Sequence, residues 1–208
     1  MTGQSSRLAV VFRDALRDLP QGWFHHAEKM LDLVEGLRPS VLVELGTWRG
    51  ASAIAFARTL TPWNGIVYGV DTFTGGVNGG RTPSPPKMLT ETAGNLIKAR
   101  VSSRVRLIVS PTRDAGLAWS GPPIDALYVD ADHTREGVRS DLETWWPHLR
   151  EGGLIAGDDY ENPMYPGVRE AWDEFETVHG QTFERFATPN TNPPGMRLIY
   201  GWKRTERS

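Results

Sequence analysis

Residues 41–60 read VLVELGTWRGASAIAFARTL, and this stretch sets the expected class of fold. The apolar run Val41–Leu45 predicts a short buried strand, and Ala51–Leu60 predicts a helix that follows it. The turn between them contains Gly46 and Gly50, which let a ligand approach the backbone while the next helix points its N-terminus at that ligand. Neither the dinucleotide pattern GxGxxG nor the phosphate pattern GxxxxGK(S/T) is present. An ordinary strand-to-helix turn therefore stays open as an alternative.

Short apolar runs and helical patterns alternate along the rest of the chain. Further strands are predicted at Ile66–Val70, Arg104–Val109, Ala126–Val129, Gly153–Ala156, Thr182–Phe186 and Arg197–Trp202, and helices at Thr134–Leu149 and Val168–Val178. This order predicts an α/β fold with an open, doubly wound, mostly parallel sheet of seven strands. The last two strands have no helix between them, so we expect an antiparallel hairpin at one edge.

Composition and charge exclude several classes of function. The 208 residues suit one domain, and the net charge of −2 argues against a nucleic-acid binder held by a broad basic surface. The absence of cysteine excludes disulfides, zinc fingers, iron–sulfur clusters and cysteine nucleophiles, so any metal must be held by oxygen or imidazole. No run is long and apolar enough for a membrane helix, and residues 1–20 predict an amphipathic helix, not a signal peptide. We therefore expect a cytoplasmic protein that binds neither nucleic acid nor membrane.

Acidic residues stand where the predicted strands end, which is where ligands bind in open parallel sheets. Asp71 ends the second strand and suits the two hydroxyls of a ribose, although it could also cap a turn. Asp130 and Asp132 follow the fourth strand, and Asp158 and Asp159 follow the fifth. Carboxylates this close repel one another unless a cation neutralises them, and oxygen ligands suit Mg²⁺ or Mn²⁺. The alternatives are that Asp132 caps the next helix and that the Asp158–Asp159 pair is solvated.

Histidines near these acids have two different interpretations. His133 lies three residues beyond Asp130, at a predicted helix start, and is a candidate general base. His25 and His26 lack such a setting and are interpreted as solvent-facing or interface residues.

Four motifs together resemble the class I S-adenosylmethionine-dependent methyltransferases, and more narrowly the metal-dependent macrocin- and mycinamicin-type sugar O-methyltransferases. The motifs are VELGTWRGASA within Val41–Ala53, YGVDTF at Tyr68–Phe73, YVDADHTREGVRSDLETWWPHLREGGLIAGDDY at Tyr128–Tyr160, and PGVREAWDEF at Pro166–Phe175. The resemblance implies a Rossmann-like methyltransferase fold in a single domain. Residues 1–40 and the Gly- and Pro-rich lid do not match the family closely. We interpret residues 1–40 as helical dimer or lid elements and residues 74–90 as a mobile lid.

The resemblance also implies roles for individual residues. It places the methionine and ribose parts of the cofactor against Glu44, Gly46 and Gly50, the ribose hydroxyls on Asp71, and the adenine near Thr72, Phe73 and Ser110. Thr47, Ser52 and Asp130 are further expected cofactor-binding residues. The resemblance gives Mg²⁺ or Mn²⁺ to Asp130, Asp158 and Asp159, with Asp130 and His133 as the catalytic pair.

The function implied is Mg²⁺-dependent transfer of a methyl group from S-adenosylmethionine to a hydroxyl of a sugar or glycoside, with His133 as base. O-methylation of a catechol or another phenolic natural product is the alternative, and a non-catalytic S-adenosylmethionine-binding protein is a third interpretation. Candidate contacts to the acceptor are Trp48, Trp63, Arg49, Arg81 and Arg135. A homodimer is the expected assembly.

Overall fold

The computed structural model describes residues 14–20, 22, 24–75, 85–189, 191 and 193–204. Most of the predicted first helix lies outside these ranges, as do Arg81 and the larger part of the predicted lid. Within the described part, Ala15 is buried in the core, and the Arg58 guanidinium donates to the carbonyl oxygens of Ala15 and Arg17. The chain just before residue 20 is therefore packed against the domain.

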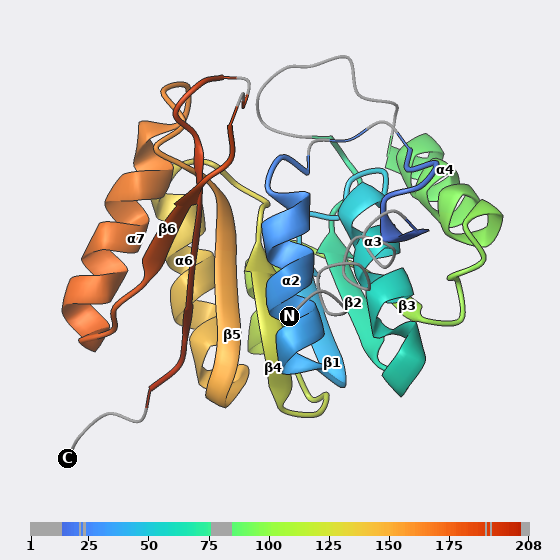
Figure 1. Ribbon diagram of the computed structural model, residues 1–208, viewed down its shortest axis with the longest axis horizontal. Coiled ribbons are helices and arrows are strands. Elements are labelled where there is room, and N and C mark those ends of the chain that lie inside the picture. The colour runs from blue at the N-terminus through green and yellow to red at the C-terminus, as the bar shows by residue number, and fades with distance from the viewer. Residues whose placement is uncertain are drawn as a thin grey trace, which may run out of the picture.

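Seven strands form one mixed sheet in the order β3-β2-β1-β4-β5-β7-β6 (Figure 1). The strands are β1 Val41–Leu45, β2 Ile66–Asp71, β3 Val105–Val109, β4 Ile124–Val129, β5 Leu149–Tyr160, β6 Glu184–Ala187 and β7 Arg197–Trp202. Strands β1 to β5 pair in parallel, and β7 runs antiparallel to both β5 and β6. This confirms the predicted doubly wound sheet and its antiparallel edge hairpin. The chain order places the carboxyl ends of β1, β2, β4 and β5 along one edge of the sheet.

Helices cover both faces of the sheet because alternate strand residues point to opposite sides. The helices are α2 Ala27–Leu37, α3 Ala51–Leu60, α4 Pro85–Lys98, α5 Thr112–Leu117, α6 Arg135–Trp145 and α7 Pro166–His179, with short 3-10 turns at Thr61–Trp63 and Trp146–His148. On β1, Leu42 packs with α2 and α3 in one cluster, whereas Val41, Val43 and Leu45 pack with α6 and α7 in the other. Among the described residues, no helix combines the length and the apolar character needed to cross a membrane.

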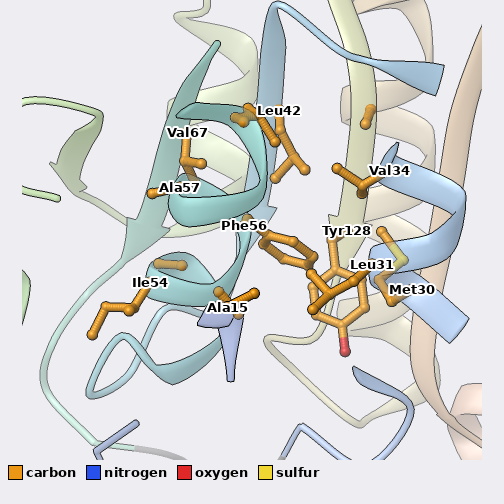
Figure 2. Packing of buried hydrophobic residues seen from close by; sticks show 14 of the residues in the cluster. Ala15, Met30, Leu31, Val34, Leu42, Ile54, Phe56, Ala57, Val67 and Tyr128 are labelled. Atoms are coloured by element: carbon orange, nitrogen blue, oxygen red, sulfur yellow. The ribbon is translucent and has the colours of Figure 1, made fainter. Parts of the chain in front are cut away.

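The core cluster on the α2 side contains aromatic rings, among them those of Phe56 and Tyr128 (Figure 2). Phe56 of α3 and Tyr128 of β4 meet edge to face at 5.4 Å, and Phe24 meets both rings in the same way. The Tyr128 hydroxyl points out of this apolar cluster. Apolar packing therefore fixes a tyrosine whose polar end faces the edge where ligands are expected.

The sequence missed two helices. Helix α4 begins at Pro85, inside the stretch predicted as a loop and lid, and only residues 74 and 75 of that stretch are described outside the helix. Its apolar stripe is sparse, with Met88 and Leu96 buried among polar residues. Helix α5 has six residues, too few to show a helical period.

Candidate functional site

The turn after β1 touches the backbone of the turn after β4. Gly46 has φ +90°, and a Cβ on this residue would overlap the carbonyl oxygen of Asp130. Gly50 has φ +83° and is the residue before α3. Glycine is therefore required at position 46 for two independent reasons, the left-handed backbone and the close approach.

Glu44, the last but one residue of β1, is a buried acid without a charged partner. Its side chain is inaccessible to solvent, and neither carboxyl oxygen has a hydrogen-bond partner of good geometry. Burial raises the pKa of Glu44 to about 8, against the opposing effect of the Ser52 and Thr47 hydroxyls. A buried carboxyl of this kind is costly unless a donor or cation pairs with it. A positively charged ligand group bound near this end of β1 would stabilise the charged form of Glu44.

Asp71 joins the turns after β1 and β2. Its Oδ2 accepts the backbone N–H of Trp48 at 2.8 Å, and its Oδ1 accepts that of Phe73 at 2.7 Å. Trp48 and Phe73 both have positive φ, at 44° and 53°, so the carboxylate holds two strained turns together. Each oxygen retains a second lone pair, and the side chain is only partly buried. The predicted ribose contact is compatible with this geometry and stays a prediction.

The residues predicted near adenine differ in their exposure. Phe73 is 1% exposed, so its ring belongs to the core and offers its backbone only. Thr72 and Ser110 are partly exposed, and the Ser110 N–H donates to the Asp71 carbonyl at 3.1 Å. The ends of β2 and β3 are thus joined beside Asp71.

Asp130, His133 and Asp159 form the acidic centre of the site. His133 Nε2 lies 2.8 Å from Asp159 Oδ2 and 3.6 Å from Asp130 Oδ1. One ligand atom from each of the three residues lies within 4.8 Å of the others, which is a spacing that can hold a metal ion. The His133 ring stacks on Tyr165, with centroids 4.4 Å apart. Imidazole and carboxylate together suit a divalent cation.

The charges of this acidic centre are strongly coupled. Burial acts to lower the pKa of His133, but its contacts with Asp130 and Asp159 outweigh burial and raise that pKa to about 10. Burial raises the pKa of Asp130 to about 6, whereas His133 holds the pKa of Asp159 below its usual range despite burial. Without a cation, His133 is therefore a proton-carrying partner of the two acids.

Asp158 and Asp159 have different partners, at a point where the pairing of β5 with β7 is irregular and Asp159 has a left-handed φ of 60°. Its Oδ2 accepts the Tyr128 hydroxyl at 3.1 Å, and its Oδ1 accepts the Asp159 N–H at 2.9 Å and lies 3.4 Å from His26 Nε2. Burial, followed by Asp130 and Asp159, raises the pKa of Asp158 well above its usual range. The three-residue group spaced for a metal thus contains His133 where the sequence places Asp158, whose role as a ligand stays a prediction.

His26 is not a solvent-facing residue, and that interpretation of the sequence is wrong. Its side chain is fully buried, with Nδ1 2.7 Å from the Thr188 hydroxyl oxygen. Burial and the neighbouring His25 lower the pKa of His26 to about 4, against the effect of Asp159. No local pattern signals this burial, because the atoms that cover His26 come from the end of β5 and the segment after β6.

The other candidates mostly have structural partners. Asp132 Oδ1 accepts the Thr134 N–H at 2.7 Å, and Thr134 caps α6, so Asp132 shapes the helix start without being its cap. Trp63 donates to the Pro39 carbonyl at 2.8 Å, just before β1, and so lies at the wrong end of the sheet for an acceptor. Arg49 pairs with Glu91 and Arg135 with Glu174. Trp48 is partly exposed beside the glycine turn and remains a candidate contact.

Two further residues belong to the site and were missed from the sequence. Asn162 donates through Nδ2 to Asp159 Oδ1 at 2.6 Å and through its N–H to the Asp159 carbonyl, which supports the φ of 60° at Asp159. The Asn162-Pro163 pair signals a turn, and that signal could have found it. Tyr165 covers the His133 ring and carries no comparable signal.

Comparisons with known proteins agree with this architecture. The family described as "Methyltransferase domain" matches residues 43–160, more than half of the chain. Among curated proteins, "Uncharacterized protein y4gI" of Sinorhizobium fredii (strain NBRC 101917 / NGR234) is 26% identical over 167 residues, 77% of this chain. The chain spans only 18% of the length of that relative.

Two solved structures are similar in fold. One is the O-methyltransferase from Bacillus cereus in complex with SAH, with 19% identity, a TM-score of 0.66, and coverage of 95% of this chain and 91% of that one. The other is the O-methyltransferase TomG from Streptomyces achromogenes, involved in tomaymycin synthesis and solved with SAM, with 18% identity, a TM-score of 0.66, and coverage of 94% and 89%.

Proposed function

The chain belongs to the methyltransferase-domain family, and from this premise we propose that it is an S-adenosylmethionine-dependent O-methyltransferase that uses Mg²⁺ and acts on a hydroxyl of a sugar or glycoside. The observation that carries the proposal is the pairing of two unlike features at one sheet edge. The glycine turn with buried Glu44 and Asp71 suits the cofactor. The cluster of Asp130, His133 and Asp159 lies beside it, because Gly46 and Asp130 are in backbone contact.

Two acids and a glycine turn form the proposed cofactor-binding part of the site. Glu44 gives a positively charged methionine ammonium a buried counter-charge, and Asp71 accepts from the ribose hydroxyls through the lone pairs left free by Trp48 and Phe73. Gly46 and Gly50 allow the positive φ angles that shape this turn, with φ +90° and +83°. When bound, S-adenosylmethionine would supply an activated methyl group on sulfur, and these residues would orient it toward the acceptor.

The acceptor side uses Asp130, Asp159 and His133. Asp130 and Asp159 would hold a divalent cation, which would supply Lewis-acid activation of an acceptor hydroxyl and offset the two negative charges beside His133. Nε2 of the neutral His133 ring would accept the hydroxyl proton as general base. Tyr165, stacked on the ring, keeps Nε2 directed at the acids.

The sugar hydroxyl is chosen as acceptor because the sequence motifs resemble those of sugar-modifying members. A catechol is the second candidate, since any pair of neighbouring oxygens suits a cation held by the carboxylates of Asp130 and Asp159. A panel of sugars, glycosides and catechols assayed for methyl transfer separates the two.

Titration of S-adenosylhomocysteine into the protein by calorimetry tests the cofactor part. We expect one site per chain and a dissociation constant in the micromolar range, as an order of magnitude for small-molecule ligands. Absence of heat at millimolar protein would overturn the proposal. Turnover that is unchanged in excess EDTA would remove the metal part and leave the cofactor part intact.

A further inference from the structure

His26 is the N-cap residue of helix α2, which begins at Ala27, yet its side chain makes no capping hydrogen bond to that helix. It points instead at the sheet edge, where Nδ1 meets the Thr188 hydroxyl at 2.7 Å and Nε2 lies 3.4 Å from Asp158 Oδ1. The imidazole is completely buried, and its Nε2 has no partner of good hydrogen-bond geometry. Burial of the two ring nitrogens of His26 costs free energy, which raises the question of what its contacts with Thr188 and Asp158 achieve.

The atom that His26 Nε2 approaches, Asp158 Oδ1, already accepts a hydrogen bond. Asp158 Oδ1 accepts the backbone N–H of Asp159 at 2.9 Å, and Asp159 has the left-handed φ of 60°. The other carboxyl oxygen of Asp158 accepts the Tyr128 hydroxyl, whose ring is locked in the aromatic stack with Phe56. The orientation of Asp158 therefore sets the backbone of Asp159.

Asp159, in turn, supplies one of the oxygens of the acidic centre, 2.8 Å from His133 Nε2. We propose that His26 is a positioning residue, which holds Asp158 so that Asp159 presents its carboxylate to His133 and to a divalent cation. The relay runs from Thr188 through His26 and Asp158 to the Asp159 backbone. This inference rests on the proposed metal site.

The same contact closes one wall of the site. Phe24, two residues before His26, packs on Phe56 and Tyr128, and Thr188 directly follows β6. His26 thus ties the segment before α2 to the segment after β6. Loss of a residue that orients a metal ligand commonly lowers metal affinity about 10- to 100-fold. Removal of His26 should therefore weaken cation binding, although His26 lies outside the three-residue group.

Mn²⁺ binding, followed by electron paramagnetic resonance, tests the relay without need of an acceptor. We expect His26→Phe to raise the Mn²⁺ dissociation constant about 10-fold or more. His26→Gln retains a donor that reaches Asp158 and should stay within about threefold of the wild type, while Thr188→Val should give a smaller loss than His26→Phe. The affinity for S-adenosylhomocysteine should change less than about twofold in each, since no cofactor residue contacts His26.

Two controls separate positioning from general damage. His148→Phe removes a partly buried histidine that is not part of the site. Its Nε2 lies 2.9 Å from the Gly116 carbonyl oxygen, and the variant should leave Mn²⁺ affinity unchanged. The double variant His26→Phe/Asp158→Asn should bind Mn²⁺ as Asp158→Asn does, because both act through one carboxylate.

The inference is overturned if His26→Phe binds Mn²⁺ like the wild type, if His26→Gln loses as much affinity as His26→Phe, or if Mn²⁺ and S-adenosylhomocysteine affinities fall together. A wild-type protein that binds S-adenosylhomocysteine but no Mn²⁺ overturns the metal part of the proposed function and this inference with it.

Discussion

Gly46 and Asp130 are in direct backbone contact, and a Cβ at position 46 would overlap the Asp130 carbonyl oxygen. This contact joins the turn that suits the cofactor to the first residue of the acidic centre. The spacing between the proposed cofactor turn and the acidic centre is therefore set by main chain, which is less free to move than side chains.

Substitution of Gly46 by alanine is expected to separate the two turns. The overlap with backbone atoms and the φ of +90° both oppose a side chain there, so we expect a loss of roughly 1–3 kcal/mol in stability and at least tenfold in S-adenosylhomocysteine affinity. Calorimetry and urea denaturation measure the two effects. Gly94→Ala is the matched control, because a Cβ there has no neighbour within 4 Å and helix α4 should gain slightly. Equal behaviour of the two variants would contradict this account.

The stability contributed by Glu44 should depend on pH in a defined direction. Its pKa rises to about 8 on folding because burial disfavours the charged form. The folded protein therefore binds the proton more tightly, and this contribution is complete at acid pH and lost as pH rises toward about 8. Glu44→Gln should remove this pH-dependent loss of stability. Between about pH 5 and about pH 9, the free energy of unfolding of the variant should therefore rise relative to that of the wild type by a few kcal/mol at most. Parallel stability curves for the two proteins would refute the buried, unpaired state of Glu44.

The same variant should weaken the cofactor. Glutamine cannot supply a charge opposite the ammonium group, so we expect S-adenosylhomocysteine affinity to fall by about tenfold, which is a typical loss for one charge-assisted hydrogen bond. Calorimetry at a pH near 8 measures this affinity. An unchanged affinity would show that Glu44 does not interact with the ammonium group.

Helix α6 contains a second buried acid, Asp141, which is 1% exposed and has an unpartnered Oδ2. Burial raises its pKa to about 7, opposed by the Thr112 hydroxyl, so its contribution to stability is also lost as pH rises toward about 7. Asp141→Asn should be about 1–3 kcal/mol more stable than the wild type at a pH near 8 and close to it near pH 4. Urea denaturation at the two pH values checks this, and a variant less stable at both would show that the Thr112 hydrogen bond outweighs the cost of burying the carboxylate.

His133 should titrate differently with and without a cation. Its contacts with Asp130 and Asp159 overcome burial and raise its pKa to about 10, so the ring stays protonated near neutral pH in metal-free protein. Excess Mg²⁺ or the substitution Asp159→Asn should each lower that pKa by a unit or more, as an order of magnitude for the removal of one close charge. Histidine NMR measures this, with His148 as the internal reference. A His133 signal that ignores both changes would contradict the proposed acidic centre.

Residues with a local reason for their structure were predictable from sequence. Val41–Leu45 and Arg197–Trp202 are apolar runs between turn signals, and both strands have the predicted bounds. The crowding of acids at the strand ends followed from the parallel order, which brings Asp130 and Asp159 together although they are far apart in the chain. Such features depend on period and topology, which a sequence displays.

Features that depend on tertiary packing were not predictable. The burial of His26 requires Thr188 and Asp158 to close over it, and no local pattern records that. The adjacent acids Asp158 and Asp159 were assigned one role, but the structure gives them different partners, at an irregular point of β5 where Asp159 has a left-handed φ. Trp63 appeared available to an acceptor because sequence alone does not show that its indole binds the Pro39 carbonyl.

The central claim is methyl transfer from S-adenosylmethionine to a hydroxyl oxygen. Its most direct test is incubation with S-adenosylmethionine carrying a deuterated methyl group and a panel of sugars, glycosides and catechols, followed by mass spectrometry. The account predicts a labelled methyl group on oxygen of a sugar-type acceptor, lost on addition of EDTA and restored by Mg²⁺. Label on nitrogen or carbon, or no binding of the cofactor to the folded protein, would contradict it.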